Sequence, residues 1–144
     1  MSERASKVAA DKFGILGPLY ADIGGEIAEI VGGDPNGIFL YVEAGEGWIS
    51  CGIFKEEGVA IRYFRPTSDL TDLLLEAWNA EEAGKRWSVM EYEIKGTKFD
   101  ASFKFPDEVV VGDFDRAREE TAVKNHFGDK PVIYPPWPPE RPAE

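Results

Sequence analysis

The two most reactive side-chain types occur once each in this chain, as His126 and Cys51. A histidine can act as a general base or hold a metal, and a cysteine thiolate can act as a nucleophile. Cys51 lies in an apolar run with no adjacent basic residue, which is typical of an inert buried thiol. His126 lies near the expected end of a helix, where a cap or dipole contact is its ordinary role.

The other candidate groups fit structural roles as well as chemical ones. Two acidic pairs could gather a divalent cation: Asp107 with Glu108, and Asp113 with Asp115. Both lack the regular alternation and internal glycine of a calcium loop. The glycines at 45, 47 and 52 lack the spacing and the following helix of a phosphate-binding loop.

Basic residues near the C-terminus do not suggest a phosphate site either. Arg116, Arg118 and Lys124 are interleaved with Glu119 and Glu120, a pattern that indicates a salt-bridged helix surface. The sequence therefore predicts no catalytic residue, no cofactor and no metal. We expect a binding protein rather than an enzyme.

Acidity is concentrated in the first third of the chain. From Phe13 to Phe54 there is no Lys or Arg, while the same stretch holds six carboxylates: Asp22, Glu26, Glu29, Asp34, Glu43 and Glu46. The formal net charge is −11 and the isoelectric point is near 4.6. This balance opposes binding to nucleic acid or to an anionic membrane and favours encounter with a basic protein. General solubility is the alternative reading of the same charge.

Compartment is indicated by what the sequence lacks. One cysteine excludes an intramolecular disulfide. The first 12 residues lack the apolar core of a signal peptide, and no run approaches the roughly 20 apolar residues of a membrane span. We expect a cytoplasmic protein.

The length of 144 residues and an apolar content of 43% predict one domain. We place it at 13–128, after a flexible N-terminal arm (1–12) and before an extended Pro-rich tail (129–144) that contains Tyr134 and Trp137. Self-packing of that tail and docking into a partner both remain open.

Hydrophobic spacing predicts an α+β fold of order αβββαββα. Helical spacing runs from Leu16 to Val31, with Gly24 and Gly25 implying close packing or a break, and again from Leu70 to Trp78. Strand runs are expected at 38–44, 48–55, 59–65, 87–94 and 98–105, and a third helix at 113–127 capped by Asp113. Short glycine-containing connections predict an antiparallel five-stranded sheet with three helices.

A partner-binding surface follows from these elements. Five carboxylates fall at or near the expected hairpin tips: Asp34, Glu43, Glu46, Glu56 and Glu57. We expect them at one end of the sheet, where they would steer a basic partner. Trp48 begins a strand that is apolar on both faces, so that strand is either covered on each side or open to a partner on one side.

The second half of the chain resembles the YezG-like family of immunity proteins, which neutralise bacterial polymorphic or contact-dependent toxins. The similarity lies in the Leu-rich helix before Lys85-Arg86-Trp87, the hairpin 90–99 continuing to 103–108, and the helix 116–128 ending in His126-Phe127-Gly128. With Leu19-Tyr20 it spans roughly residues 16–136. The resemblance implies stoichiometric inhibition of a toxin domain, often a nuclease, and no catalytic residues. The Pro/Trp tail and the glycine-rich first hairpin depart from the family, which leaves the toxin class open.

The order αβββαββα, the small size and the acidity also look like the dimeric chaperones of type III secretion and their YbjN-type relatives. Those proteins bind unfolded effector segments along apolar patches. That similarity implies a homodimer whose docking surface would be the strand from Trp48 to Phe54. Immunity protein and secretion chaperone are therefore the two main hypotheses. An enzyme is a third, which would need an active site built from carboxylates alone, without a visible pair.

Overall fold

A six-stranded mixed sheet forms the middle layer of the computed structural model, which describes residues 2–109 and 114–135, with side chains described from residue 17 onward. The elements follow the chain as α1 (Ser2–Val31), β1 (Phe39–Gly45), β2 (Trp48–Glu57), β3 (Ala60–Phe64), α2 (Ser68–Ala80), β4 (Val89–Lys95), β5 (Lys98–Lys104), α3 (Arg116–Phe127) and β6 (Val132–Ile133). The order across the sheet is β5-β4-β1-β2-β3-β6. The α+β class and the three helices are confirmed.

The sheet differs from the predicted five-stranded antiparallel one by a sixth strand, β6. This two-residue strand pairs in parallel with β3, opposite Ile61 and Arg62, and the Ile61 amide donates to the Pro131 carbonyl at 2.8 Å. Prolines on both sides keep the strand short because they donate no ladder hydrogen bond. Part of the predicted tail therefore belongs to the sheet, whereas Trp137 lies outside the described residues.

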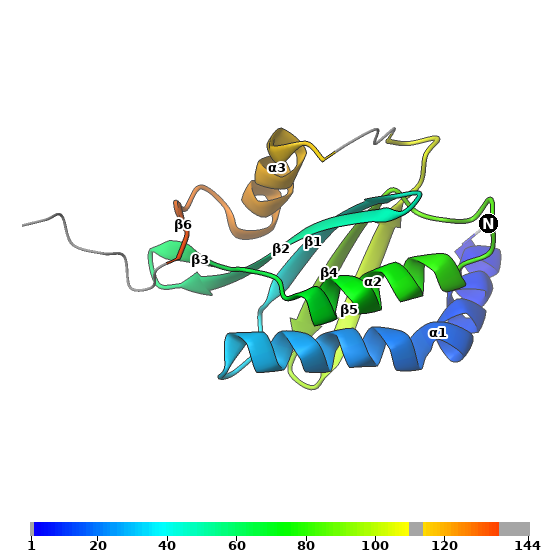
Figure 1. Cartoon of the computed structure of the whole chain (residues 1–144), viewed down its shortest axis with the longest axis horizontal. Coiled ribbons are helices and arrows are strands. Elements are labelled where there is room, and N and C mark those ends of the chain that lie inside the picture. Colours follow the sequence, from blue (N-terminus) through cyan, green and yellow to red (C-terminus); the bar gives the residue numbers. More distant parts are fainter. Residues whose placement is uncertain (1, 110–113, 136–144) are drawn as a thin grey trace, which may run out of the picture.

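Helix α1 extends over residues predicted to be a flexible arm. It begins at Ser2, and it contains Pro18. Its ribbon bends between the dark-blue first turns and the rest of the helix (Figure 1), as expected where a proline ring displaces a preceding carbonyl.

The layers follow from the strand alternation. Helices α1 and α2 lie on one face of the sheet and α3 on the other (Figure 1). Along β1, Leu40 and Val42 join the core under α1 and α2, whereas Phe39 and Tyr41 join a smaller core under α3. Six consecutive buried residues in β1 reflect coverage on both faces.

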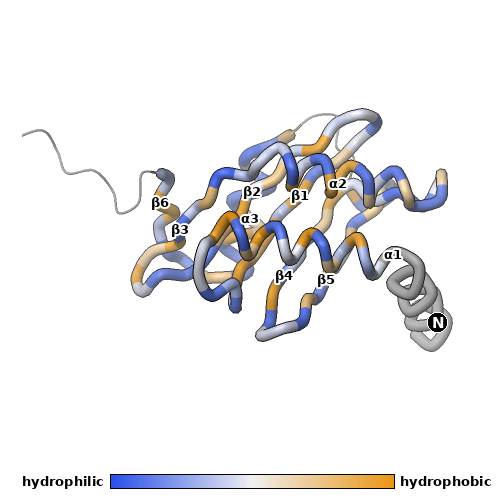
Figure 2. The backbone as a smooth tube through the Cα atoms, turned by 60° about the horizontal axis from the view of Figure 1, so that its bottom comes forward, coloured by the Kyte–Doolittle hydropathy of each residue, from blue (hydrophilic) through white to orange (hydrophobic). Residues whose placement is uncertain are grey.

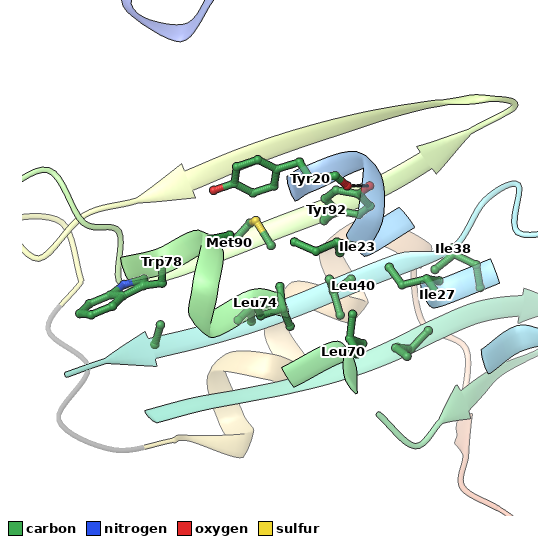
Figure 3. Packing of buried hydrophobic residues seen from close by; sticks show 14 of the residues in the cluster. Tyr20, Ile23, Ile27, Ile38, Leu40, Leu70, Leu74, Trp78, Met90 and Tyr92 are labelled. Atoms are coloured by element: carbon green, nitrogen blue, oxygen red, sulfur yellow. Dashed lines mark hydrogen bonds between the residues drawn. The ribbon is translucent and has the colours of Figure 1, made fainter. Parts of the chain in front are cut away.

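The larger core is aliphatic and aromatic. Ile23 and Ile27 of α1 and Leu70 and Leu74 of α2 point toward Leu40 of β1 (Figure 3). Hydrophobic and hydrophilic stretches alternate along α1 and α2 (Figure 2), the pattern of helices that bury one face. The strand expected at 98–105 is present as β5 and alternates strictly, because Phe99, Ala101 and Phe103 pack on this core while the intervening residues are exposed.

Local capping sets where the later helices begin. The Thr67 hydroxyl accepts from the Leu70 amide at 3.2 Å and starts α2. The Asp115 carboxylate accepts from the Ala117 amide at 2.8 Å and starts α3, so the predicted cap at Asp113, which lies outside the described residues, is replaced by Asp115. At the other end Gly128, with φ of 89°, closes α3, so the helix ends at Phe127 as expected.

Candidate functional site

The five carboxylates expected at one end of the sheet do not gather there. In a meander successive turns lie at opposite ends, so Glu46, between β1 and β2, is at one end and the turn after Glu57 is at the other. Asp34 precedes β1 and lies at the second end, where its carbonyl accepts from Lys55 at 2.8 Å. The prediction of one contiguous patch is wrong because it ignored this alternation.

Three of these acids are also occupied locally. Glu56 pairs with Lys130, whose ammonium also donates to the Gly58 carbonyl at 2.9 Å. Glu57 lies 3.9 Å from Arg62. The Asp34 carboxylate accepts from the Asn36 amide at 3.0 Å and closes the turn before β1. The surface potential of this end is correspondingly reduced.

Glu43 is not a surface residue at all. Its side chain is fully buried under α3, and the Arg118 guanidinium binds both carboxylate oxygens, Nε to Oε2 at 3.0 Å and Nη2 to Oε1 at 3.1 Å. The Tyr41 hydroxyl donates to Oε2 at 2.6 Å and the Asp115 amide donates to Oε1 at 3.2 Å. Burial and this donated bond raise the pKa of Tyr41. Four donated bonds make Glu43 the anchor of α3 rather than part of a partner surface.

The central part of β2 is covered on both faces, whereas its two ends are only partly buried. Trp48 is half-buried, with its indole over Gly45 on the opposite strand. Cys51 and Ile53 pack on the larger core and Phe54 on the core under α3. The central residues of β2, from Gly52 to Phe54, are therefore covered on each side and offer no open docking face.

One acidic surface does form, on α1 and α2. The two helices lie side by side and antiparallel (Figure 1), with the Tyr20 hydroxyl donating to Glu81 at 3.1 Å at one end. At the other end, partial desolvation and then the charges of Glu29 and Asp69 raise the pKa of Glu26. We call the surface formed by Glu26, Glu29 and Asp69 the α1–α2 acidic face. Within the described side chains, no Lys or Arg forms an ion pair with any of these three residues.

This surface has a signal in the sequence. Glu26 and Glu29 belong to the stretch without basic residues and recur at the i, i+3 spacing of one helix side. Asp69 follows the cap of α2, where an acidic residue is favoured by the helix dipole. The antiparallel packing of the helices, which joins these groups, could not be derived from either segment alone.

A second buried carboxylate, Glu119 of α3, was predicted to lie on a salt-bridged helix surface. It is 4% exposed and lines a pocket of about 460 Å³ with Phe54, Val123, Val132 and Tyr134. Burial, against which the charge of Arg116 acts in part, raises its pKa to about 7. The helical spacing of Glu119 with Ala122 and Val123, which are also buried, is the signal that could have placed it inward.

His126 and Cys51, each the only residue of its type in the chain, both pack against other side chains. The His126 ring stacks on Phe39 with centroids 4.3 Å apart, and its Nε2 lies 3.2 Å from Glu93 Oε2. Burial raises the pKa of Cys51 to about 12, which keeps its sulfur protonated at neutral pH. Among the described residues no group of three or more His, Cys, Asp or Glu side chains is placed to hold a metal. In the same part of the chain, no helix has both the length and the apolar character needed to cross a bilayer.

Comparison with known proteins adds no relative, since no family model and no curated protein sequence matches the chain. The candidate site is therefore defined by geometry. It consists of the α1–α2 acidic face on one side of the sheet and the Glu119 pocket on the other.

Proposed function

We propose that this chain is a protein-binding domain of the immunity type, which binds and blocks a basic toxin domain such as a nuclease and catalyses no reaction itself. The observation that carries the proposal is the α1–α2 acidic face. Its three carboxylates form no ion pair with a described Lys or Arg, and desolvation and then the charges of Glu29 and Asp69 raise the pKa of Glu26. The proposed mechanism is still electrostatic attraction of a basic partner, but the acidic surface lies on α1 and α2 and not at the hairpin tips.

Electrostatics gives this surface a specific use. Nucleases present basic grooves to their substrates, and an acidic inhibitor associates with such a groove rapidly and in a salt-dependent way. Glu26 is held beside two like charges, so a cation placed between Glu26, Glu29 and Asp69 relieves their mutual repulsion. Binding of a basic partner is thereby favoured over binding of a neutral one.

The test first identifies the neighbouring gene, where this proposal expects a toxin with a basic C-terminal domain, and uses that domain as the binding partner. The double variant Glu29→Lys with Asp69→Lys should slow association at least about tenfold and flatten its dependence on salt between about 0.05 and 0.3 M. The control, Glu46→Lys with Asp107→Lys, makes the same change in net charge at exposed positions on other elements. It should stay within about twofold of the wild type. Equal effects of both variants would show that net charge, not this face, governs association.

The second candidate is a chaperone of the type III secretion or YbjN type. Two observations favour it: the first eight elements follow the order αβββαββα, and the β3 edge already holds an extended segment of the chain's own C-terminal part. Addition of a strand to a sheet edge is a common way to bind an unfolded peptide. Because β2 is covered, the docking surface under this hypothesis would be a sheet edge.

Sedimentation and peptide binding separate the two candidates. A chaperone should be a dimer at micromolar concentration, should be encoded near a secreted effector, and should bind unfolded peptides of that effector. A monomer that binds none of these peptides excludes this candidate. A monomer that forms a one-to-one complex with the folded toxin domain supports the first.

A further inference from the structure

We propose that the pocket between α3 and residues 128–134 binds an organic cation, an alkylammonium or guanidinium group on a short apolar stem, with the Glu119 carboxylate as its counter-charge. The proposal is independent of the α1–α2 acidic face, which lies on the other side of the sheet. It assigns a role to a buried ionisable group that the proposed function does not use.

The first argument is that the buried Glu119 carboxylate has no hydrogen-bond or ion-pair partner among the described residues. Glu119 is 4% exposed, yet within residues 17–109 and 114–135 no hydrogen bond or ion pair reaches its oxygens. Glu43, the other acid buried under α3, receives four donated bonds. Because buried carboxylates in proteins are ordinarily paired, a buried acid that lines an open pocket without a partner indicates a ligand-binding position.

The backbone makes room for this carboxylate. A Cβ built on Gly52 of β2 would lie 2.7 Å from Glu119 Oε2, so only glycine allows the side chain to rest on the strand. The same Cβ would lie 2.9 Å from Phe54 Cε2. The Glu119 carboxylate thus occupies the space that a side chain at position 52 would fill.

The charged groups around the pocket favour a cation. Among the charges that act on Glu119, that of Arg116 in the first turn of α3 is the largest and has the opposite sign, while Glu43 and Glu120 act with the same sign. Arg116 Nη1 donates to the Tyr134 hydroxyl at 3.1 Å. The two lysines of the rim, Lys124 and Lys130, pair with Asp129 and Glu56. Tyr63 of β3 packs on the core under α3, and the charge of Glu119 contributes to its raised pKa; the same charge acts on Cys51, which packs on the other face of β2.

The size and lining set the class of ligand. A volume of about 460 Å³ falls within the usual range for small-molecule pockets. Phe54, Val123 and Val132 supply an apolar wall, and exposed Tyr134 adds an aromatic side chain to the lining. An apolar stem would pack on this wall while its cationic head meets the carboxylate and an aromatic face. The head could belong to a free amine or to a Lys or Arg side chain of a protein.

The experiment is an NMR titration of the ¹⁵N-labelled full chain with n-butylammonium, n-butylguanidinium and neutral n-butanol. Saturable shifts at Gly52, Glu119 and Val132 are expected with the two cations. Binding of butanol should be at least about tenfold weaker, since a bond between charged groups is lost. The peptide acetyl-Ala-Lys-Ala-amide decides the source: binding at the same residues shows that a protein side chain fits, and its exclusion points to a free amine.

Two variants locate the charge. Glu119→Gln should weaken binding of butylammonium at least about tenfold, whereas Glu120→Gln, an exposed neighbour on the same pocket, should change it by less than about twofold. In the wild type, the ¹³C carboxyl titration of Glu119 should move to lower pH when butylammonium is added, a result that needs no variant to fold. Equal binding of butanol, full binding by Glu119→Gln, or no saturable shift with either cation would overturn the proposal.

Discussion

The Glu43 carboxylate and the Arg118 guanidinium are 75 positions apart in the chain and meet in a two-point ion pair beneath the first turn of α3. The pair joins the central strand to the only described helix on that face of the sheet. Arg118 also lies 3.3 Å from Asp115, the N-cap of α3, so one guanidinium links the strand to the start of the helix. The position of α3, and with it the Glu119 pocket, depends on this contact.

Removing the arginine should therefore be costly. Arg118→Gln leaves Glu43 charged and buried with fewer donors, and we expect the free energy of unfolding to fall by about 3–5 kcal/mol. Urea denaturation followed by tryptophan fluorescence measures the change. Lys85→Gln removes an exposed pair with Glu82 and should cost less than about 0.5 kcal/mol.

A double-mutant cycle shows whether the two residues act as a unit. Glu43→Gln with Arg118→Gln removes both charges, so its cost should be clearly smaller than the sum of the two single changes. Additive costs would mean that the pair contributes no coupling and that α3 is held by its apolar contacts alone.

Glu119 makes stability depend on pH in the direction opposite to an ion-paired acid. Its pKa is about 7 in the folded chain, above the ordinary 4.5, so the native state binds the proton more tightly than the unfolded state does. This contribution is fully present below about pH 4.5 and is lost as the pH rises to about 7. Across this window the wild type should lose about 1–3 kcal/mol relative to Glu119→Gln, a range that allows for solvent screening. Unfolding curves of both proteins at several pH values measure it, and a difference that grows in the other direction would mean that Glu119 is ion-paired in solution.

Most of the fold could be predicted because its signals are local. Leu70, Leu74 and Trp78 repeat at helical spacing after a Thr67 cap, and Phe99, Ala101 and Phe103 alternate as a half-buried strand does. β6 could not be predicted in the same way, since two residues between prolines carry no periodicity. Its pairing with β3 depends on where α3 places the chain.

The prediction of the partner-binding surface was wrong because that surface depends on contacts between elements. Glu43 occupies a strand in which every neighbour is buried, and only the distant Arg118 explains a carboxylate there. Glu26 and Asp69 come together because α1 and α2 pack antiparallel, a relation between elements that neither helix encodes. Local patterns therefore gave the elements, while the site depended on contacts between residues far apart in sequence.

Cys51 should be nearly inert toward thiol reagents in the folded protein. Burial, and after it the charge of Glu119, raises its pKa to about 12, so very little thiolate exists at pH 8. We expect reaction with a disulfide reagent to be at least about a hundredfold slower in the native state than in the urea-unfolded chain. Absorbance of the released thiol follows both reactions. A native rate within about tenfold of the unfolded one would show that β2 opens readily.

The adjacent glycines of α1 should respond in opposite directions to the same substitution. The Tyr92 hydroxyl donates to the Tyr20 carbonyl at 2.7 Å, a bond drawn in Figure 3, and a Cβ on Gly24 would lie 2.7 Å from that hydroxyl oxygen. Gly24→Ala should therefore destabilise the protein by about 1–3 kcal/mol, because buried Tyr92 cannot move away without losing its bond.

A Cβ on exposed Gly25 would meet nothing within 4 Å, so Gly25→Ala should stabilise the protein by up to about 1 kcal/mol through helix propensity alone. Thermal unfolding of the two variants beside the wild type measures both effects. Since the substitutions are chemically identical and one position apart, propensity predicts the same sign for both, and only the contact with Tyr92 separates them. Stabilisation by both would mean that Tyr92 does not approach the helix backbone in solution.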